Sequence, residues 1–367
     1  MSNATVGKHP CPECGGDLQW NAGKQSLACP YCGTIVPWKN AEAGSPGDIV
    51  ENDLTFALEK HPVDQRGWGE EKREVKCQSC QAISVFIGGK VAQRCEFCGS
   101  PSIIDHESER DAITPQYVLP FKISDGQVRD SIRKWYGSHW FAPNKLKNSA
   151  LTDTLKGVYL PYWTFDSHVH ADWTAEAGHY YYTTESYRDG QGRTQTKQVR
   201  HTRWVPANGD LDHFFDDELI PGTAGVHPEL LRKVEPFPTL TDLKNYSPEF
   251  VRGWTVERYQ IDLHKAADLN QQDMQQKTEA LCGSAVPGDT YRNLNVDADF
   301  KGRTFKHVLV PVWLVTYTYG SKNFQVLANG YTGSLAGEYP KSWIKIFFAV
   351  MLVLFVVMML FVAGANN

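Results

Sequence analysis

Eight of the nine cysteines in this chain form two copies of one metal-ligand pattern. In each copy a C-x-x-C pair is followed, after fourteen residues, by a second C-x-x-C pair, and the copies lie 66 positions apart. The cysteines are Cys11, Cys14, Cys29 and Cys32 in the first copy and Cys77, Cys80, Cys95 and Cys98 in the second. Two C-x-x-C turns can place four thiolates around one ion in a closed tetrahedral zinc site. The pattern therefore predicts two structural Zn²⁺ ions, in zinc ribbons at residues 8–38 and 76–104.

The residues around the cysteines favour this interpretation over its alternatives. Gly15, Gly33 and Gly99 follow three of the four turns, where glycine relieves a tight backbone, whereas Gln81 occupies the fourth position. Disulfides would need an oxidising compartment, and the N-terminal sequence MSNATVGKHP lacks the apolar core of a signal peptide. Catalytic zinc would need an open ligand position, which four sulfurs do not leave. Cys282 is interpreted as an ordinary free thiol.

The charge of the N-terminal region disfavours nucleic acid as a partner of the ribbons. Residues 1–110 contain eleven lysines and arginines against fifteen aspartates and glutamates, a net charge of −4. Each zinc bound by four thiolates adds about −2, which takes the region to about −8. A surface that binds phosphates should instead be basic. Between the ribbons, residues 39–75 are predicted to be an acidic linker with one short helix at 52–60.

Residues 113–340 are predicted to form an aromatic-rich domain of mixed helices and β-hairpins, with a core separate from the ribbons. Ser124 is expected to cap a helix, and Asp189-Gly190 to close a hairpin. After Pro206 the chain is predicted to be rich in loops and helices, with Asp210, Asp212, His213, Asp216 and Asp217 in a solvated acidic loop. The strands are expected at residues 118–121, 159–165, 308–319 and 324–327, and the longest helix at 262–281.

The domain contains a short internal echo. Tyr159-Leu160-Pro161-Tyr162-Trp163 resembles Leu309-Val310-Pro311-Val312-Trp313, 150 positions later. This similarity suggests two halves, each led by an aromatic-rich strand. Because proline removes a backbone donor, both strands are predicted to be edge strands or strand starts.

The C-terminal residues Ile346 to Ala363 lack any polar or charged side chain. About 20 residues at 1.5 Å each would span roughly 30 Å of hydrocarbon, so 344–365 is predicted to be one transmembrane helix. Lys341 and Lys345 precede it, which predicts a single-pass protein of the inner membrane with its domains facing the cytoplasm. The predicted fold class is therefore α+β, with two zinc ribbons, an aromatic-rich domain and a C-terminal membrane helix.

Other candidate chemistry is sparse. Asp166, His168 and His170 alternate along a predicted strand, so their side chains would share one face and could bind a second kind of metal. The alternative is a polar sheet face. The sequence contains no phosphate-binding loop, no G-x-S-x-G and no H-E-x-x-H motif, so nothing in it supports helicase, ATPase or other enzymatic activity.

Several segments together resemble a bacterial family of membrane-anchored proteins with transcription factor IIB-type zinc ribbons. The segments are CPECGGDLQW, CPYCG, CQSCQAISVF, CEFCG, GVYLPYWTFD, RHTRWVPA, HFFDDEL, FKHVLVPVW and ANGYTG. Members are often labelled primosomal protein N′ or superfamily II helicase, which the missing ATP-binding motif contradicts here. Some are encoded beside phage-shock protein A and stomatin/flotillin-type proteins. The resemblance implies an adaptor and supplies no catalytic residues.

These observations predict a tail-anchored zinc-ribbon adaptor that holds partner proteins at the cytoplasmic face of the membrane, in envelope-stress or membrane-maintenance assemblies. Phage-shock or stomatin/flotillin-type proteins are the expected partners. One alternative is a membrane-tethered, nucleic-acid-associated zinc-ribbon factor, which a basic surface patch would favour. The other is a metal-dependent enzyme that uses the face of Asp166, His168 and His170.

Overall fold

A computed structural model describes residues 10–37, 49–60, 72–87, 94–106, 112–143, 155–188, 190–320 and 322–365. The described residues are mostly β, with 45% strand and 24% helix. The predicted α+β class is therefore wrong. Three very long strands account for the difference: β9 (Leu155–Arg188), β10 (Thr194–Pro221) and β13 (Thr290–Tyr319).

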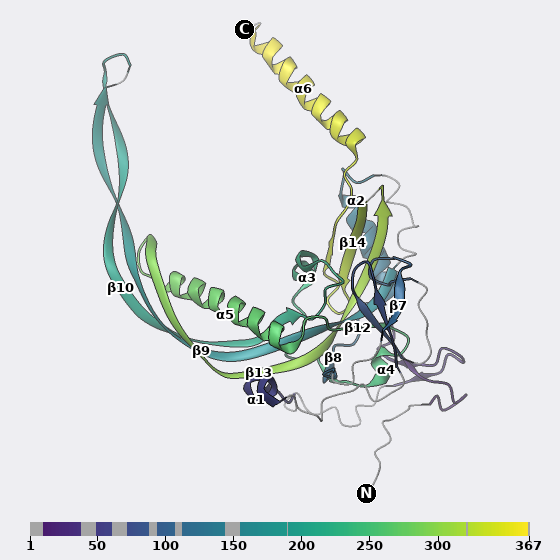
Figure 1. Cartoon of the computed structure of the whole chain (residues 1–367). Helices are drawn as coiled ribbons and strands as arrows, with labels where there is room; N and C mark the ends of the chain where they lie inside the picture. The colour runs from purple at the N-terminus through teal and green to yellow at the C-terminus, as the bar shows by residue number, and fades with distance from the viewer. Residues whose placement is uncertain are drawn as a thin grey trace.

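These three strands form a curved antiparallel sheet with β9 in the middle (Figure 1). Helix α5 (Leu263–Ala285) lies on its concave side and buries Met274 and Cys282 against the sheet. Pairing between β13 and β9 ends at Thr290 and Gly178. Beyond that point β9 and β10 continue as a two-stranded arm, which projects from the rest of the molecule in Figure 1.

The length of β10 is the main feature that the sequence did not predict. The segment after Pro206, expected to be loop and helix, continues β10, where Asp210 pairs with Asp172 and Asp212 with His170. Among the described strands β10 pairs with β9 alone, so it is an edge strand here. Charged side chains are common on edge strands because they prevent further pairing. The same acidic residues therefore resemble a solvated loop in the sequence. Asp189 of the predicted hairpin turn lies outside the described residues.

Short strands extend this sheet on both sides, in the order β11-β8-β13-β9-β12-β6-β5-β7. The additional strands are β4 (Asn52–Asp53), β5 (Lys72–Cys77), β6 (Ile83–Ile87), β7 (Ile103–His106), β8 (Tyr117–Val118), β11 (Lys244–Asn245), β12 (Thr255–Arg258), β14 (Lys322–Asn329) and β15 (Leu335–Gly337). A separate sheet contains β1 (Gln19–Asn21), β2 (Ser26–Ala28) and β3 (Ile35–Val36). The remaining helices are α1 (Leu54–Lys60), α2 (Asp125–Ser138), α3 (Pro228–Val234), α4 (Pro248–Val251) and α6 (Trp343–Ala365).

The internal echo in the sequence corresponds to two structurally equivalent halves. One half is β8-α2-β9-β10 and the other is β12-α5-β13-β14. In each half the short strand pairs in parallel with the long strand of the other half, β8 with β13 and β12 with β9. The two tryptophans of the echo make matching hydrogen bonds. Trp163 Nε1 donates to Ile261 O, and Trp313 Nε1 donates to Ile123 O. The donor–acceptor distance is 2.9 Å in both. Each acceptor directly precedes the N-cap of a helix, Ser124 of α2 or Asp262 of α5.

The prolines of the echo do not lie on edge strands, so that prediction is wrong. Pro161 is inside β9, at the point where its neighbour changes from β12 at Tyr159 to β10 at Tyr162. Pro311 is inside β13, between the stretch that pairs with β8 and the stretch that pairs with β14. At the position where one partner strand ends and the next has not begun, the backbone amide has no ladder partner on that side. Proline, which lacks an amide hydrogen, is therefore tolerated there.

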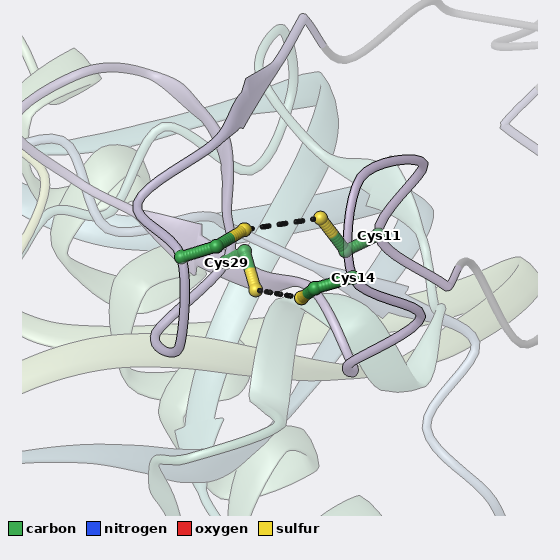
Figure 2. A group of neighbouring side chains, drawn as sticks. Cys11, Cys14 and Cys29 are labelled. Atoms are coloured by element: carbon green, nitrogen blue, oxygen red, sulfur yellow. Dashed lines mark hydrogen bonds between the residues drawn. The ribbon is translucent and has the colours of Figure 1, made fainter.

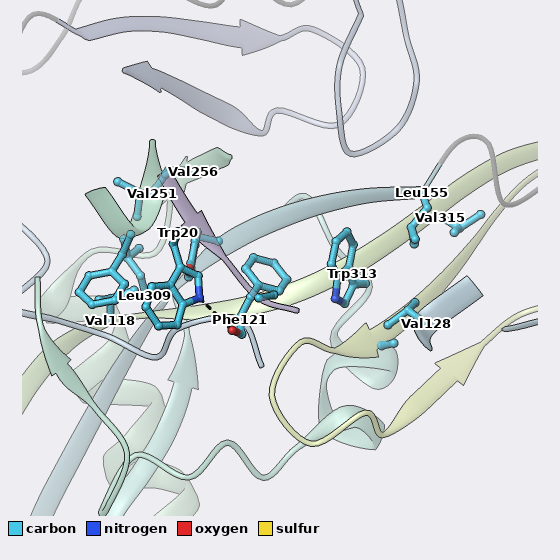
Figure 3. Packing of buried hydrophobic residues seen from close by; sticks show 14 of the residues in the cluster. Trp20, Val118, Phe121, Val128, Leu155, Val251, Val256, Leu309, Trp313 and Val315 are labelled. Carbon is cyan, nitrogen blue, oxygen red and sulfur yellow. Dashed lines mark hydrogen bonds between the residues drawn. The ribbon is translucent and has the colours of Figure 1, made fainter. Parts of the chain in front are cut away.

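The ribbons share the core of the main sheet instead of having separate cores. Leu18, Trp20 and Leu27 of the first ribbon belong to one buried cluster with Phe121 and Trp313. Trp20 Nε1 donates a hydrogen bond to Phe121 O over 3.0 Å (Figure 3). The second ribbon is joined to the sheet itself, because β6 pairs with β12. Its Phe97 is fully buried in a cluster with Leu160 and Val312.

Among the residues that the structure describes, no helix is both long and apolar enough to cross a membrane. This finding overturns the predicted span at 344–365 and the inner-membrane location inferred from it. Side chains of α6 are described only as far as Met359, so Leu360–Ala363 of the predicted span lie outside them.

Candidate metal centres

The first centre is formed by the two turns that flank β1 and β2. Cys11 Sγ lies 3.5 Å from Cys32 Sγ, and Cys14 Sγ lies 3.5 Å from Cys29 Sγ (Figure 2). All four sulfurs are within 4.8 Å of one another. Sulfurs bound to one zinc at about 2.3 Å in a tetrahedron are roughly 3.8 Å apart, so the observed distances suit an ion at the centre.

The second centre repeats this geometry within the main sheet. Cys77 Sγ lies 3.5 Å from Cys98 Sγ and Cys80 Sγ lies 3.6 Å from Cys95 Sγ, again with all four sulfurs within 4.8 Å. Cys77 ends β5, whereas Cys95 and Cys98 lie in the turn before β7. The structure thus brings together all eight predicted ligands as two four-thiol clusters able to hold metal ions.

The same backbone turn presents the cysteines at all four positions. In each turn the amide four residues after the first cysteine donates to that cysteine's carbonyl, as Gly15 N does to Cys11 O over 2.8 Å. The residue that donates has a positive φ: +73° at Gly15, +76° at Gly33 and +73° at Gly99. Gln81 adopts the same conformation, with φ of +65°, and its amide donates to Cys77 O over 3.0 Å. The departure at Gln81 therefore preserves the turn, at the expense of a backbone conformation that L-residues disfavour.

The disulfide alternative does not agree with the structure. All nine cysteines are free thiols. A disulfide would require about 2.05 Å between sulfurs, whereas the paired sulfurs of the clusters lie 3.5 or 3.6 Å apart. In each cluster the first cysteine of each pair is buried and the second is more exposed. One side of each cluster is therefore packed against protein and the other faces outward.

The thiols of each cluster affect one another's protonation. The hydrogen bond from Cys80 lowers the pKa of Cys95 to about 5, and the same bond raises the pKa of Cys80. In the first cluster the Thr34 hydroxyl, 3.1 Å from Cys32 Sγ, lowers the pKa of Cys32 to about 6. At neutral pH each cluster therefore has at least one thiolate to start metal binding. The remaining thiols must lose protons as the ion binds, so affinity should fall as the pH falls.

The residues of the predicted enzyme face do not converge on a metal site. Asp166 is buried, whereas His168 and His170 are exposed further along β9. His170 Nδ1 instead pairs with Asp212 Oδ1 over 2.7 Å. Over the described part of the chain, the two cysteine clusters are the groups of three or more potential ligands close enough to share an ion.

Asp166 belongs to a buried charge cluster that sequence reasoning missed. Lys306 Nζ, on β13, lies 2.6 Å from Asp217 Oδ1, 2.9 Å from Glu51 Oε1 and 3.9 Å from Asp166 Oδ2. Asp166 also accepts hydrogen bonds from the Asp217 amide over 2.6 Å and from the Thr304 hydroxyl over 2.9 Å. Burial raises the pKa of Asp166 to about 7. The one available sequence signal was a lysine inside the apolar strand TFKHVLVPVW.

The fold and the two centres define a β-rich protein with two four-cysteine clusters able to hold metal ions. No protein-family model matches the chain, and no solved structure matches it. Among curated proteins, it is similar to "Uncharacterized protein YdjG" from Bacillus subtilis (strain 168). The two are 24% identical over 337 residues, which cover 91% of this chain and 90% of the relative. The similarity extends through nearly the full length of both proteins.

Proposed function

We propose that this protein is a scaffold whose two clusters hold structural Zn²⁺, and that it acts as an adaptor for partner proteins. The observation that carries the proposal is the closed ligand set of each cluster, which is built into the core of the molecule. Four thiolates around one ion leave no position for substrate or water, so the metal stabilises structure instead of performing chemistry. Zinc is favoured because it accepts four thiolates in a tetrahedron without redox chemistry.

The exposed side of the first cluster supports protein docking. Tyr31 is 79% exposed and Ile35 is 47% exposed, so the ribbon presents apolar side chains outward. The Tyr31 ring lies over Gly16, where a Cβ atom would be only 2.6 Å from Tyr31 Cδ2. Glycine at this position therefore leaves room for the ring. An exposed aromatic is typical of the residues that contribute most to protein interfaces.

The family resemblance suggests phage-shock protein A and stomatin/flotillin-type proteins as the partners to test. Purified full-length chain should bind phage-shock protein A in a titration by biolayer interferometry. Tyr31→Ala combined with Ile35→Ala should weaken binding at least tenfold while zinc content stays at the level of the parent. Leu240→Ala is the matched control, because Leu240 is 52% exposed but lies outside the ribbons.

Three outcomes count against parts of the proposal. Absence of binding to either class of partner would refute the adaptor role with these proteins. Binding that the ribbon variant leaves unchanged would place docking elsewhere on the molecule. Loss of zinc in the ribbon variant would show a structural effect, and Tyr31→Phe, which keeps the ring, would then separate folding from docking.

A further inference from the structure

We infer that the projecting arm of β9 and β10 binds double-stranded nucleic acid, by insertion into the major groove. The arm consists of His179–Arg188 of β9 and Thr194–Arg203 of β10, paired in continuous antiparallel register. It lies beyond the last residue pair between β13 and β9, so none of the described strands other than β9 and β10 takes part in it (Figure 1). This inference goes beyond the scaffold proposal and does not depend on the metal centres.

The arm differs in charge from the rest of the chain. Residues 179–205 contain five arginines and lysines against two acidic residues, whereas the whole chain has a net charge of −5. The arginines and lysines are Arg188, Arg193, Lys197, Arg200 and Arg203, and all five are exposed. The adjoining stem of the sheet (residues 162–178, 206–221 and 290–303) has the opposite balance, with ten acidic residues against three basic ones. The net charge is thus positive in the part of the sheet that projects and negative in the adjoining stem.

Basic side chains lie on both faces of the arm. Successive residues of a strand point to opposite faces, and directly paired residues share a face. Arg203 pairs with His179 and Lys197 with Glu185 on one face. On the other face Arg200 pairs with Tyr182, and Arg188 with Thr194. A flat anionic surface would contact one face only, whereas a groove between two phosphate backbones contacts both.

Aromatic side chains accompany these charges. Arg200 lies over the Tyr180 ring, with the guanidinium carbon 4.4 Å from the ring centroid. The rings of Tyr181 and His201 stack with centroids 5.3 Å apart. Tyr182 is 61% exposed. The contact with Tyr180 orients the Arg200 guanidinium before binding, and the tyrosine hydroxyls add donors suited to phosphate oxygens.

The dimensions of the arm fit a duplex. Ten paired residues at about 3.3 Å each extend roughly 33 Å, close to the 34–36 Å of one helical turn. A major groove about 12 Å wide admits a two-stranded β-ribbon. The base of the arm is closely packed. The Trp204 ring lies so near Gly178 that a Cβ atom there would be 2.8 Å from it, and the Arg292 guanidinium carbon lies 4.2 Å from the centroid of the same ring.

The test is binding of the zinc-loaded full chain to a fluorescent duplex of about 20 base pairs, measured by anisotropy. Five phosphate contacts predict a slope of about −4.5 for log affinity against log salt, or roughly 500-fold weaker binding at 200 mM than at 50 mM salt. Lys197→Gln should reduce the slope to about −3.6. Replacement of all five basic residues by glutamine should abolish binding. Lys301→Gln, an exposed lysine on β13 outside the arm, is the matched control and should leave the slope unchanged.

Three results would overturn the inference. The first is a wild-type protein with no salt-dependent duplex binding at 50 mM salt. The second is duplex binding that the five-residue variant retains. The third is arm-dependent binding to vesicles of phosphatidylcholine and phosphatidylglycerol without binding to the duplex, which would assign the arm to a lipid surface. Unchanged zinc content and unchanged binding of the scaffold's protein partner in the arm variants would separate this result from any failure of the scaffold proposal.

Discussion

Replacing Gln81 by glycine should stabilise the second ribbon. Gln81 has a φ of +65°, a conformation that costs an L-residue about 1–2 kcal/mol. Glycine adopts it freely but loses about 0.5–1 kcal/mol more backbone entropy on folding. The variant also loses an exposed hydrogen bond of 2.8 Å from Gln81 Nε2 to Gln78 O, which contributes little to stability. The balance is a gain of about 0.5 kcal/mol.

Gly99→Gln is the reciprocal change in the other turn of the same cluster. Gly99 has a φ of +73°, and a Cβ atom there would meet no other atom within 4 Å. The penalty is therefore a backbone effect of about 0.5–1 kcal/mol, without a steric clash. The two changes made together should nearly cancel.

Urea unfolding of the zinc-loaded variants measures the global effect, and hydrogen exchange of peptides covering residues 77–87 and 94–106 measures the local one. A change of 0.5–1 kcal/mol corresponds to roughly two- to fivefold in the exchange rate of protected amides. Exchange should slow in Gln81→Gly and accelerate in Gly99→Gln. A neutral or destabilising Gln81→Gly, or a neutral Gly99→Gln, would refute the view that all four turns need a left-handed residue.

Three further predictions concern the core and its buried charges. Trp20→Ala should destabilise the whole protein by about 3–5 kcal/mol, because the buried indole packs with its ring centroid 5.2 Å from that of Phe250 and donates a hydrogen bond to Phe121 O. The melting temperature of the sheet, followed by circular dichroism, should fall. A loss of structure confined to the first ribbon would contradict the shared core. Lys306→Met should cost about 3–5 kcal/mol by leaving Glu51, Asp166 and Asp217 without their cation; a neutral effect in urea unfolding would contradict it. The pKa of Asp166 is raised to about 7 in the folded protein, against about 3.9 in an unfolded chain, so the folded state holds this proton more tightly. The contribution of Asp166 to the free energy of unfolding therefore falls as the pH rises from about 4 to about 7. Asp166→Asn should flatten the fall by at most about 1.4 kcal/mol per pH unit, and identical pH profiles for both proteins would refute the assignment.

The sequence was sufficient for features determined by local spacing. The cysteine pairs identified all eight cluster residues because a C-x-x-C turn fixes two ligands within four positions. The helix at Ser124 and the helix after Asp262 were also predicted correctly, since capping residues and apolar periodicity are local signals. The echo of Trp163 and Trp313 indicated the two halves that the structure contains.

Features that depend on distant pairing were not predictable. The part of β10 that follows Pro206 is determined by register with β9, and the acidic segment around Asp212 has no strand pattern of its own. Pro161 and Pro311 were misassigned to edge strands because the change of neighbouring strand opposite each proline is a tertiary property. The Lys306 cluster joins residues from segments as far apart as Glu51 and Asp217, which no local motif connects.

Metal and thiol analysis of the purified full chain is the most direct test of the central claim that two closed cysteine clusters hold structural zinc. Plasma mass spectrometry should find about two zinc ions per chain, and the eight cluster cysteines should resist thiol reagents until a chelator removes the metal. Removal should also lower the melting temperature of the entire sheet, because both clusters are packed into its core. Fewer than two ions with reactive cluster thiols, or metal-free protein that melts at the same temperature, would contradict the account.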